Sequence, residues 1–309
     1  MKVLVTGGSG FLGRHLVPLL KERYLVSVVS KSDYDLTKFE DTWECLQEHK
    51  PDVVFHLAAL SGGIGANLAR PAEFYFVNTL LIANMFESAS KLGVKDIIVP
   101  IGGCSYPSNA ISPIGEDQMW SGFPHGASAA YSSAKKMAIV AGEAYRTTGL
   151  RSSILVPGNM YGEYDNFSLE DSHVIPAIIR KVYEAKVARK SRIVMWGSGT
   201  PTRDFVYAGD VASVLIEFVE NNRFVGPLNL SSGTSISIRE VTELVCKIMG
   251  YAGEVYWDSD KPDGQLVKVF DVSKMKTFGY SCETSIEDGL EKTIDWFVEN
   301  YNSVNLVRL

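Results

Sequence analysis

The 309-residue sequence lacks the long apolar segments that membrane and secreted proteins carry. It has no run of about 18 apolar residues, the minimum for a membrane-spanning helix. The apolar stretch before Gly7 is shorter than the roughly 7 to 15 residues of a signal peptide core. We therefore expect a soluble, cytoplasmic protein without a membrane partner.

Cysteine is scarce and scattered. Cys45, Cys104, Cys246 and Cys282 form no Cys-x-x-Cys pair and no Cys/His cluster. This spacing argues against a zinc site and against a disulfide framework. We expect four free thiols and no metal.

The charge pattern provides no basic stripe for nucleic acid. Acidic residues number 36 and basic residues 30, mixed along the chain, for a net charge of -6. A hydrophobic content of 46% is typical of a globular enzyme. A chain of this length can form one large domain, alone or with a smaller lobe.

A strand, a glycine-rich turn and a helix are predicted at the start of the chain. Residues 2–6 lead into a short β-branched run, glycines follow at 7, 10 and 13, and leucines with helical spacing begin at Leu12. Such glycines allow a tight turn and a close approach of pyrophosphate to the helix N-terminus. The alternative is an ordinary turn, because a single glycine-rich motif is weak evidence.

The end of the next predicted strand, residues 25–29, bears on cofactor choice. NAD-binding folds usually place an acidic residue here, but this chain has Ser30-Lys31-Ser32. That favours NADP, although Asp33 and Asp35 lie nearby. We expect Asp35 to meet the adenine or to cap a helix opening at residues 35–37.

Strands and helices continue to alternate as far as Pro157. The strands are predicted at 51–59, 96–101 and 152–156, and the helices at 71–92 and 129–147. This pattern predicts an α/β fold with a doubly wound parallel sheet of the Rossmann type. His56, inside an apolar strand, is expected to be a core histidine.

Beyond Pro157 the pattern loosens, and we predict a smaller substrate lobe. The expected domains are residues 1–157, which bind NADP and to which later segments return, and residues 158–309, mainly the lobe. Its predicted elements are a loop to 172, helices at 173–188, from 210, 237–249 and 285–299, and strands at 192–195 and near 228.

Tyr131 and Lys135 are four residues apart in a predicted helix, so they share one face. A lysine ammonium close to a tyrosine favours the phenolate, which suits proton exchange with a carbonyl. Tyr-x-x-x-Lys also occurs by chance in many helices. The pair is informative only with the motifs around it.

Together the glycine turn, His56-Leu57-Ala58-Ala59 and Tyr131-x-x-x-Lys135 resemble the extended short-chain dehydrogenase/reductase family. Within it the chain is most similar to the GDP-L-fucose synthases, NADP-dependent enzymes that epimerise a GDP-4-keto-6-deoxymannose at C3 and C5 and reduce C4. The similarity covers nearly the whole chain. Its specific segments are 61–67 (SGGIGAN), 157–162 (PGNMYG), 165–167 (DNF), 172–177 (SHVIPA), 196–205 (WGSGTPTRDF) and 261–264 (KPDG).

The resemblance implies catalytic roles for four residues. Tyr131 is the proton donor and Lys135 anchors the cofactor, whereas Cys104 and His173 act as base and acid on opposite faces of the sugar. A 4-keto group acidifies the flanking C–H bonds, so these two groups can invert a centre through an enolate. The alternatives are a small buried hydrophobe for Cys104 and a capping or surface histidine for His173.

The resemblance also implies two binding sets. The NADP(H) contacts are Gly7, Ser9, Gly10, Phe11, Leu12, Gly13, Ser30, Lys31, Asp35, Leu36, Leu57, Ala58, Ala59, Asn78, Lys135 and Pro157. The nucleotide-sugar contacts are Asn159, Lys181, Trp196, Arg203 and Lys268. For Lys181 and Lys268 the alternative is an ordinary solvated surface lysine. The helices at 71–92 and 129–148 match those through which many relatives form a homodimer.

One departure from the family pattern concerns Gly102, which stands where relatives carry a serine or threonine supporting the C4 oxygen. Loss of one such donor costs roughly 100- to 1000-fold in rate in other enzymes. Ser105 or a water could substitute. Three readings follow: an epimerase/reductase, an epimerase with little or no reductase activity, and a non-catalytic NADP-binding sensor.

Overall fold

The structure is a computed structural model that describes residues 1–221, 226–261, 263, 265–303 and 307. Pro262 and Gly264 of the predicted 261–264 motif lie outside the described residues. In the part of the chain that is described, no helix has the length and apolar character needed to cross a membrane.

A six-stranded parallel sheet forms the centre of the molecule, which confirms the predicted doubly wound fold. Its order is β10-β5-β4-β3-β1-β2. These strands are β1 (Lys2–Thr6), β2 (Leu25–Val29), β3 (Val53–His56), β4 (Asp96–Pro100), β5 (Arg151–Pro157) and β10 (Leu228–Leu230). The chain turns from β2 back across β1 to β3, so the switch point lies at the carboxyl ends of β1 and β3.

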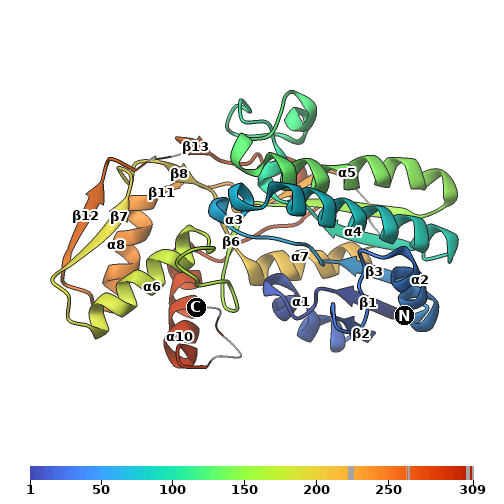
Figure 1. Ribbon diagram of the computed structural model, residues 1–309, viewed down its shortest axis with the longest axis horizontal. Helices are drawn as coiled ribbons and strands as arrows, with labels where there is room; N and C mark the ends of the chain where they lie inside the picture. Colours follow the sequence, from blue (N-terminus) through green and yellow to red (C-terminus); the bar gives the residue numbers. More distant parts are fainter. Residues whose placement is uncertain (222–225, 262, 264, 304–306, 308–309) are drawn as a thin grey trace.

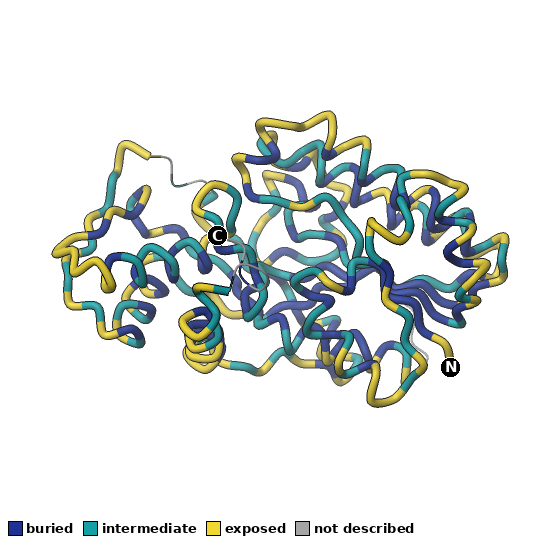
Figure 2. Tube along the Cα trace, turned by 60° about the horizontal axis from the view of Figure 1, so that its bottom comes forward, coloured by how far each residue is buried: buried dark blue, intermediate teal, exposed yellow. Residues whose placement is uncertain are grey.

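Helices cover both faces of this sheet (Figure 1). On one face lie α2 (Phe39–His49), α4 (Pro71–Lys91) and α5 (Ala129–Tyr145), and on the other α1 (Phe11–Lys21) and α7 (Ala208–Glu220). Successive strand residues point to opposite faces of the sheet. Leu4 therefore packs in the core under α2, α4 and α5, whereas Val3 and Val5 pack in the core under α1 and α7. The inner strands are therefore largely buried, whereas the edge strand β2 is mostly half-buried or exposed (Figure 2).

A second group of elements has its own hydrophobic core, built around Phe167, Ile179 and Phe297. It contains α6 (Val174–Val187), β7 (Arg192–Trp196), α8 (Ile238–Met249), β12 (Glu254–Asp258) and α10 (Ile286–Asn300). These lie to the left in Figure 1. The division into two domains at residue 157 stays a prediction.

Several short strands connect the two groups, and the sequence did not predict them. β6 (Asn159–Tyr161) lies in the segment that was expected to be a loop, and it pairs with β9 (Phe205–Tyr207). β8 (Thr202–Arg203) lies between β11 (Ile236–Ser237) and β13 (Val267–Lys268). The short helices α3 (Ile64–Ala69) and α9 (Ser273–Thr277) were also missed.

The predicted start of α2 was wrong. The helix begins at Phe39 with Lys38 as N-cap, so Asp35 does not cap it. Instead the Asp35 carboxylate accepts hydrogen bonds from Thr37 N (3.3 Å) and Thr37 Oγ1 (2.7 Å). Residues 35–37 thus form a local turn, stabilised by the Asp35 side chain, where a first helical turn was expected.

Candidate active site

The glycine turn after β1 packs directly against the segment that leaves β3. Gly7 has φ +68°, and a β-carbon added there would lie 2.8 Å from Ala58 N. One added at Gly13 would lie 2.5 Å from Gly8 Cα. The first turn of α1 has no side-chain cap, which leaves N–H groups available to an anion. This cradle fits the pyrophosphate of a dinucleotide.

The turn after β2 leaves one basic residue uncommitted. Asp33 Oδ2 accepts from Ser30 N (2.8 Å) and Ser30 Oγ (2.7 Å), and these bonds lower the pKa of Asp33. The carboxylates of Asp33 and Asp35 are thus both engaged within their own turns. Lys31 is exposed beside them and suits a 2′-phosphate.

Buried polar side chains hold the segment after β3. Thr6 Oγ1 accepts from Ala58 N (3.2 Å) and lies 2.9 Å from His56 Nδ1. Burial lowers the pKa of His56 to about 3, so it is the neutral core histidine that was predicted. Asn78 accepts from Leu60 N (3.1 Å) and donates to Leu60 O (3.0 Å) and Phe74 O (2.7 Å). The amide of Asn78, expected to meet the cofactor, therefore positions this loop.

Tyr131 and Lys135 lie in the first turns of α5, near the thiol of Cys104. Lys135 is 2% exposed, and burial lowers its pKa to about 8. Burial also raises the pKa of Tyr131, and the nearby Cys104 adds to that rise. The expected lowering of this pKa by Lys135 is not found, and the raised pKa keeps the phenol protonated at neutral pH.

The segment after β4 carries Cys104 to this point. A β-carbon added to Gly102 would lie 2.9 Å from Cys104 Sγ and 3.6 Å from Tyr131 Cε1. One added to Gly103 would lie 2.5 Å from Phe270 Cζ. The two glycines therefore let the thiol approach Tyr131 while Phe270 packs against the backbone. All four cysteines are free thiols, as predicted.

The β8–β13 pair places two cations next to this cluster. Lys268 is in register with Arg203, and its ammonium lies 5.8 Å from the Phe270 ring. Burial lowers the pKa of Lys268, whereas Cys104 opposes that change. Lys268 is therefore a half-buried lysine near the thiol, and the solvated-surface alternative is wrong. Arg203 Nη1 donates to Thr202 O (2.8 Å) and Gln265 O (2.6 Å).

Trp196 lies on the surface of the lobe between two lysines. Its side chain is 66% exposed, with Lys181 Nζ 5.6 Å and Lys261 Nζ 5.7 Å from its ring. Lys181 Nζ also donates to Val194 O (3.4 Å). An exposed aromatic face with flanking cations suits a base or sugar joined to phosphates.

His173 is the N-cap residue of α6, but its side chain makes no capping bond. Its Nδ1 lies 3.9 Å from Asp165 Oδ1, and Asp165 raises the pKa of His173. The loop before it contacts the turn after β3, where Gly63 N donates to Asp171 O (2.9 Å). Among the described residues no hydrogen bond joins His173 to Cys104 or Tyr131.

Two buried residues that organise the site were missed from the sequence. Asp204 is 0% exposed and accepts from Ser232 Oγ (2.7 Å) and Phe270 N (3.2 Å), and Asn159 Nδ2 donates to its backbone oxygen (2.9 Å). Asn229 accepts from Tyr106 OH (2.6 Å). The available signals were an aspartate directly before the apolar pair 205–206 and an asparagine between two leucines at 228–230.

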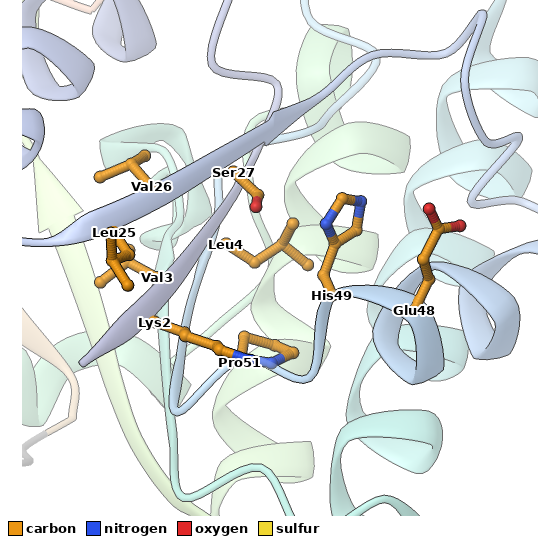
Figure 3. Close-up of a pocket in the computed structure, with 9 residues that line it drawn as sticks. All are labelled: Lys2, Val3, Leu4, Leu25, Val26, Ser27, Glu48, His49 and Pro51. Atoms are coloured by element: carbon orange, nitrogen blue, oxygen red, sulfur yellow. The ribbon is translucent and has the colours of Figure 1, made fainter.

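A hollow at the opposite end of the sheet is a poorer candidate (Figure 3). It lies at the amino-terminal ends of β1 and β2, whereas ligands of open α/β sheets bind at the carboxyl ends. Its lining residues are Lys2, Val3, Leu4, Leu25, Val26, Ser27, Glu48, His49 and Pro51.

The chain is similar to known proteins over nearly its whole length. The profile described as the NAD dependent epimerase/dehydratase family matches residues 3–230. GDP-L-fucose synthase 1 of Arabidopsis thaliana is 35% identical over 302 residues, which cover 97% of this chain and 94% of the relative. The GDP-L-fucose synthase of Sinorhizobium fredii is 35% identical over 301 residues, covering 97% and 96%. A GDP-L-fucose synthetase from Naegleria fowleri solved with NADP has a TM-score of 0.89 at 27% identity, covering 100% and 96%.

Proposed function

This chain belongs to the NAD dependent epimerase/dehydratase family, and on that premise we propose that it epimerises a GDP-4-keto sugar at C3 and C5 and reduces it at C4. It is an enzyme of the extended short-chain dehydrogenase/reductase type, and its cofactor is NADP(H). The observation that carries the proposal is the meeting of Cys104, Tyr131, Lys135 and Lys268 beside the β4 end.

For epimerisation, Cys104 as thiolate removes a proton from a carbon next to the ketone. His173 returns a proton from the other face. The cationic side chains of Lys135 and Lys268 lie near the Cys104 sulfur. Asp165 raises the pKa of His173, which favours the protonated form that an acid requires.

For reduction, Tyr131 donates its proton to the C4 oxygen. Burial raises its pKa, so the proton is present at neutral pH. NADPH, when bound, supplies the hydride. Gly7, Gly10 and Gly13 would cradle its pyrophosphate, Lys31 its 2′-phosphate and Lys135 its ribose.

The nucleotide sugar would extend from this cluster into the lobe. Arg203 and Lys268 suit the diphosphate, because a planar guanidinium and an ammonium bind phosphate oxygens. Trp196 with Lys181 offers a face for the base or sugar. Asn159, held by Asp204, lies between the two groups of elements.

The direct test is incubation with GDP-4-keto-6-deoxymannose in deuterated water. We expect deuterium at C3 and C5 without NADPH, and NADPH oxidation when it is added. A non-catalytic sensor would give neither signal. The second candidate, an epimerase without reductase activity, is favoured by Gly102 and would give only the exchange.

We further propose that the enzyme is a homodimer formed through α4 and α5. Met137, Val140 and Ala144 form an exposed apolar row at helical spacing on α5, and Phe76 and Ala83 do so on α4. An exposed apolar patch on adjacent helices is typical of an interface.

A further inference from the structure

The sulfur of Cys104 lies where a side chain at position 102 would begin. The ideal β-carbon position of Gly102 is 2.9 Å from Cys104 Sγ and 3.6 Å from Tyr131 Cε1. A serine or threonine at 102 would therefore collide with the thiol in its present rotamer. The thiol and the phenol flank the same point, and apart from the residues adjacent in the chain they are the two side chains nearest to it.

Resting on the function proposed above, we propose that Cys104 also replaces the hydroxyl missing at position 102, by donating a thiol hydrogen bond to the carbonyl oxygen that Tyr131 protonates. The thiol is a weaker donor than a hydroxyl, but it is already beside Tyr131. A donor aimed at the oxygen where charge develops accelerates the step most when it is preorganised.

Ser105 is the other hydroxyl in this segment, and it is badly placed for the task. Its side chain is fully buried, and Oγ has no hydrogen-bond partner among the described residues. Cys104 is partly exposed, so a substrate can reach it. The geometry thus selects the thiol over the neighbouring serine.

The proton balance of the two steps fits this second role. In epimerisation the Cys104 thiolate takes the proton from carbon and becomes a thiol, while His173 gives a proton to the opposite face. In reduction the hydride adds to C4 and the Tyr131 proton goes to its oxygen, leaving the S–H bond intact. Between the inversions at C3 and C5, and again before the next cycle, Cys104 loses its proton to solvent and His173 regains one. After the second inversion Cys104 is therefore in the protonation state that the reduction uses.

The test separates the two steps with a pre-equilibrated substrate. A GDP-4-keto-6-deoxy sugar is first equilibrated at C3 and C5 by wild type without NADPH and then freed of enzyme. NADPH oxidation is measured on this substrate for wild type, Cys104→Ala, Cys104→Ser and Gly102→Ser/Cys104→Ala. Deuterium exchange and NADPH affinity are measured in parallel.

We expect Cys104→Ala to lose exchange and to oxidise NADPH about 100-fold more slowly. Cys104→Ser should also lose exchange but stay within about tenfold of wild type in oxidation, because it retains a donor. In the double variant the sulfur that blocks position 102 is absent, so the new hydroxyl fits and should restore oxidation without exchange. Unchanged NADPH affinity shows that the variants are folded.

Full oxidation rate in Cys104→Ala would overturn the inference and leave Cys104 a base alone. A double variant as slow as Cys104→Ala would also overturn it. Exchange by wild type without any NADPH oxidation would overturn it while supporting the epimerase. Absence of both activities in wild type would overturn this inference together with the proposed function.

Discussion

Arg203 and Lys268 are paired in register on the neighbouring strands β8 and β13, so two cations lie side by side. Residues paired in register share a face of the sheet. Burial lowers the pKa of Lys268, and repulsion from Arg203 lowers it further. Because these two cations repel each other when no ligand is bound, the pair is suited to binding a dianion such as a diphosphate.

We therefore expect Arg203→Ala to weaken binding of a GDP-sugar at least tenfold and to leave NADPH binding unchanged. Arg239→Ala is the matched control, because Arg239, like Arg203, donates from its guanidinium to a backbone oxygen, in this case Ser198 O. Calorimetric titration of both ligands checks this. Equal loss of GDP-sugar affinity in the two variants would make the role of Arg203 structural.

Replacement of Lys31 should change the cofactor preference. The nearby carboxylates are engaged in their own turns, so Lys31 is the group left to meet a 2′-phosphate. We expect Lys31→Asp to weaken NADPH binding at least tenfold and to improve NADH binding. Lys38→Asp, an exposed lysine at the start of α2, serves as control for net charge. Equal affinity of wild type for both cofactors would refute the assignment.

The regular elements of the sheet were predictable because their patterns are local. β1, β2, β4, β5, α1 and α4 follow periodicities and turn residues that the sequence displays directly. The two- and three-residue strands β6, β8, β9, β11 and β13 were missed, because they exist only through pairing with distant segments.

The same physics limits what could be predicted of the site. Tyr131 and Lys135 share one helix, so their spacing places them together. Lys268 approaches Cys104 through β13 and the contact of Phe270 with Gly103, which no local pattern encodes. The hydrogen bonds of Asp204 are likewise long-range, and no local pattern encodes them.

Comparison of Gly7→Ala with Gly93→Ala should separate two effects. One is the stability cost of an alanine in the left-handed backbone region, and the other is the loss of cofactor binding when the glycine turn is blocked. Gly7 and Gly93 have similar φ, +68° and +73°, but a β-carbon at Gly93 meets nothing within 4 Å. Each alanine should cost about 1 to 2 kcal/mol in stability for the strained φ. Only Gly7→Ala should also displace Ala58 and abolish tight NADPH binding. Similar NADPH affinities in the two variants would place the cofactor elsewhere.

The α4–α5 surface should hold the dimer together. We expect wild type to be dimeric at micromolar concentration and Val140→Glu to be monomeric, because the carboxylate would be buried in an apolar contact. Val187→Glu, at an exposed valine ending α6, is the control. Light scattering distinguishes the masses, and a monomeric wild type would rule out this interface.

The pairing of His173 with Asp165 predicts a specific pH dependence of proton exchange. Asp165 raises the pKa of His173, so the imidazolium that acts as acid persists to higher pH than an isolated histidine would allow. Exchange should fall as pH rises through that raised pKa.

Asp165→Asn removes the charge but keeps an oxygen to accept from Asn166 N (2.7 Å), so the loop is retained. The pKa of His173 then drops toward its ordinary value, and the alkaline limb of the exchange profile should move to lower pH, with little change in rate at acidic pH. An alkaline limb that stays in place would show that Asp165 does not control His173, and a rate lost equally at every pH would indicate a purely structural role for the carboxylate.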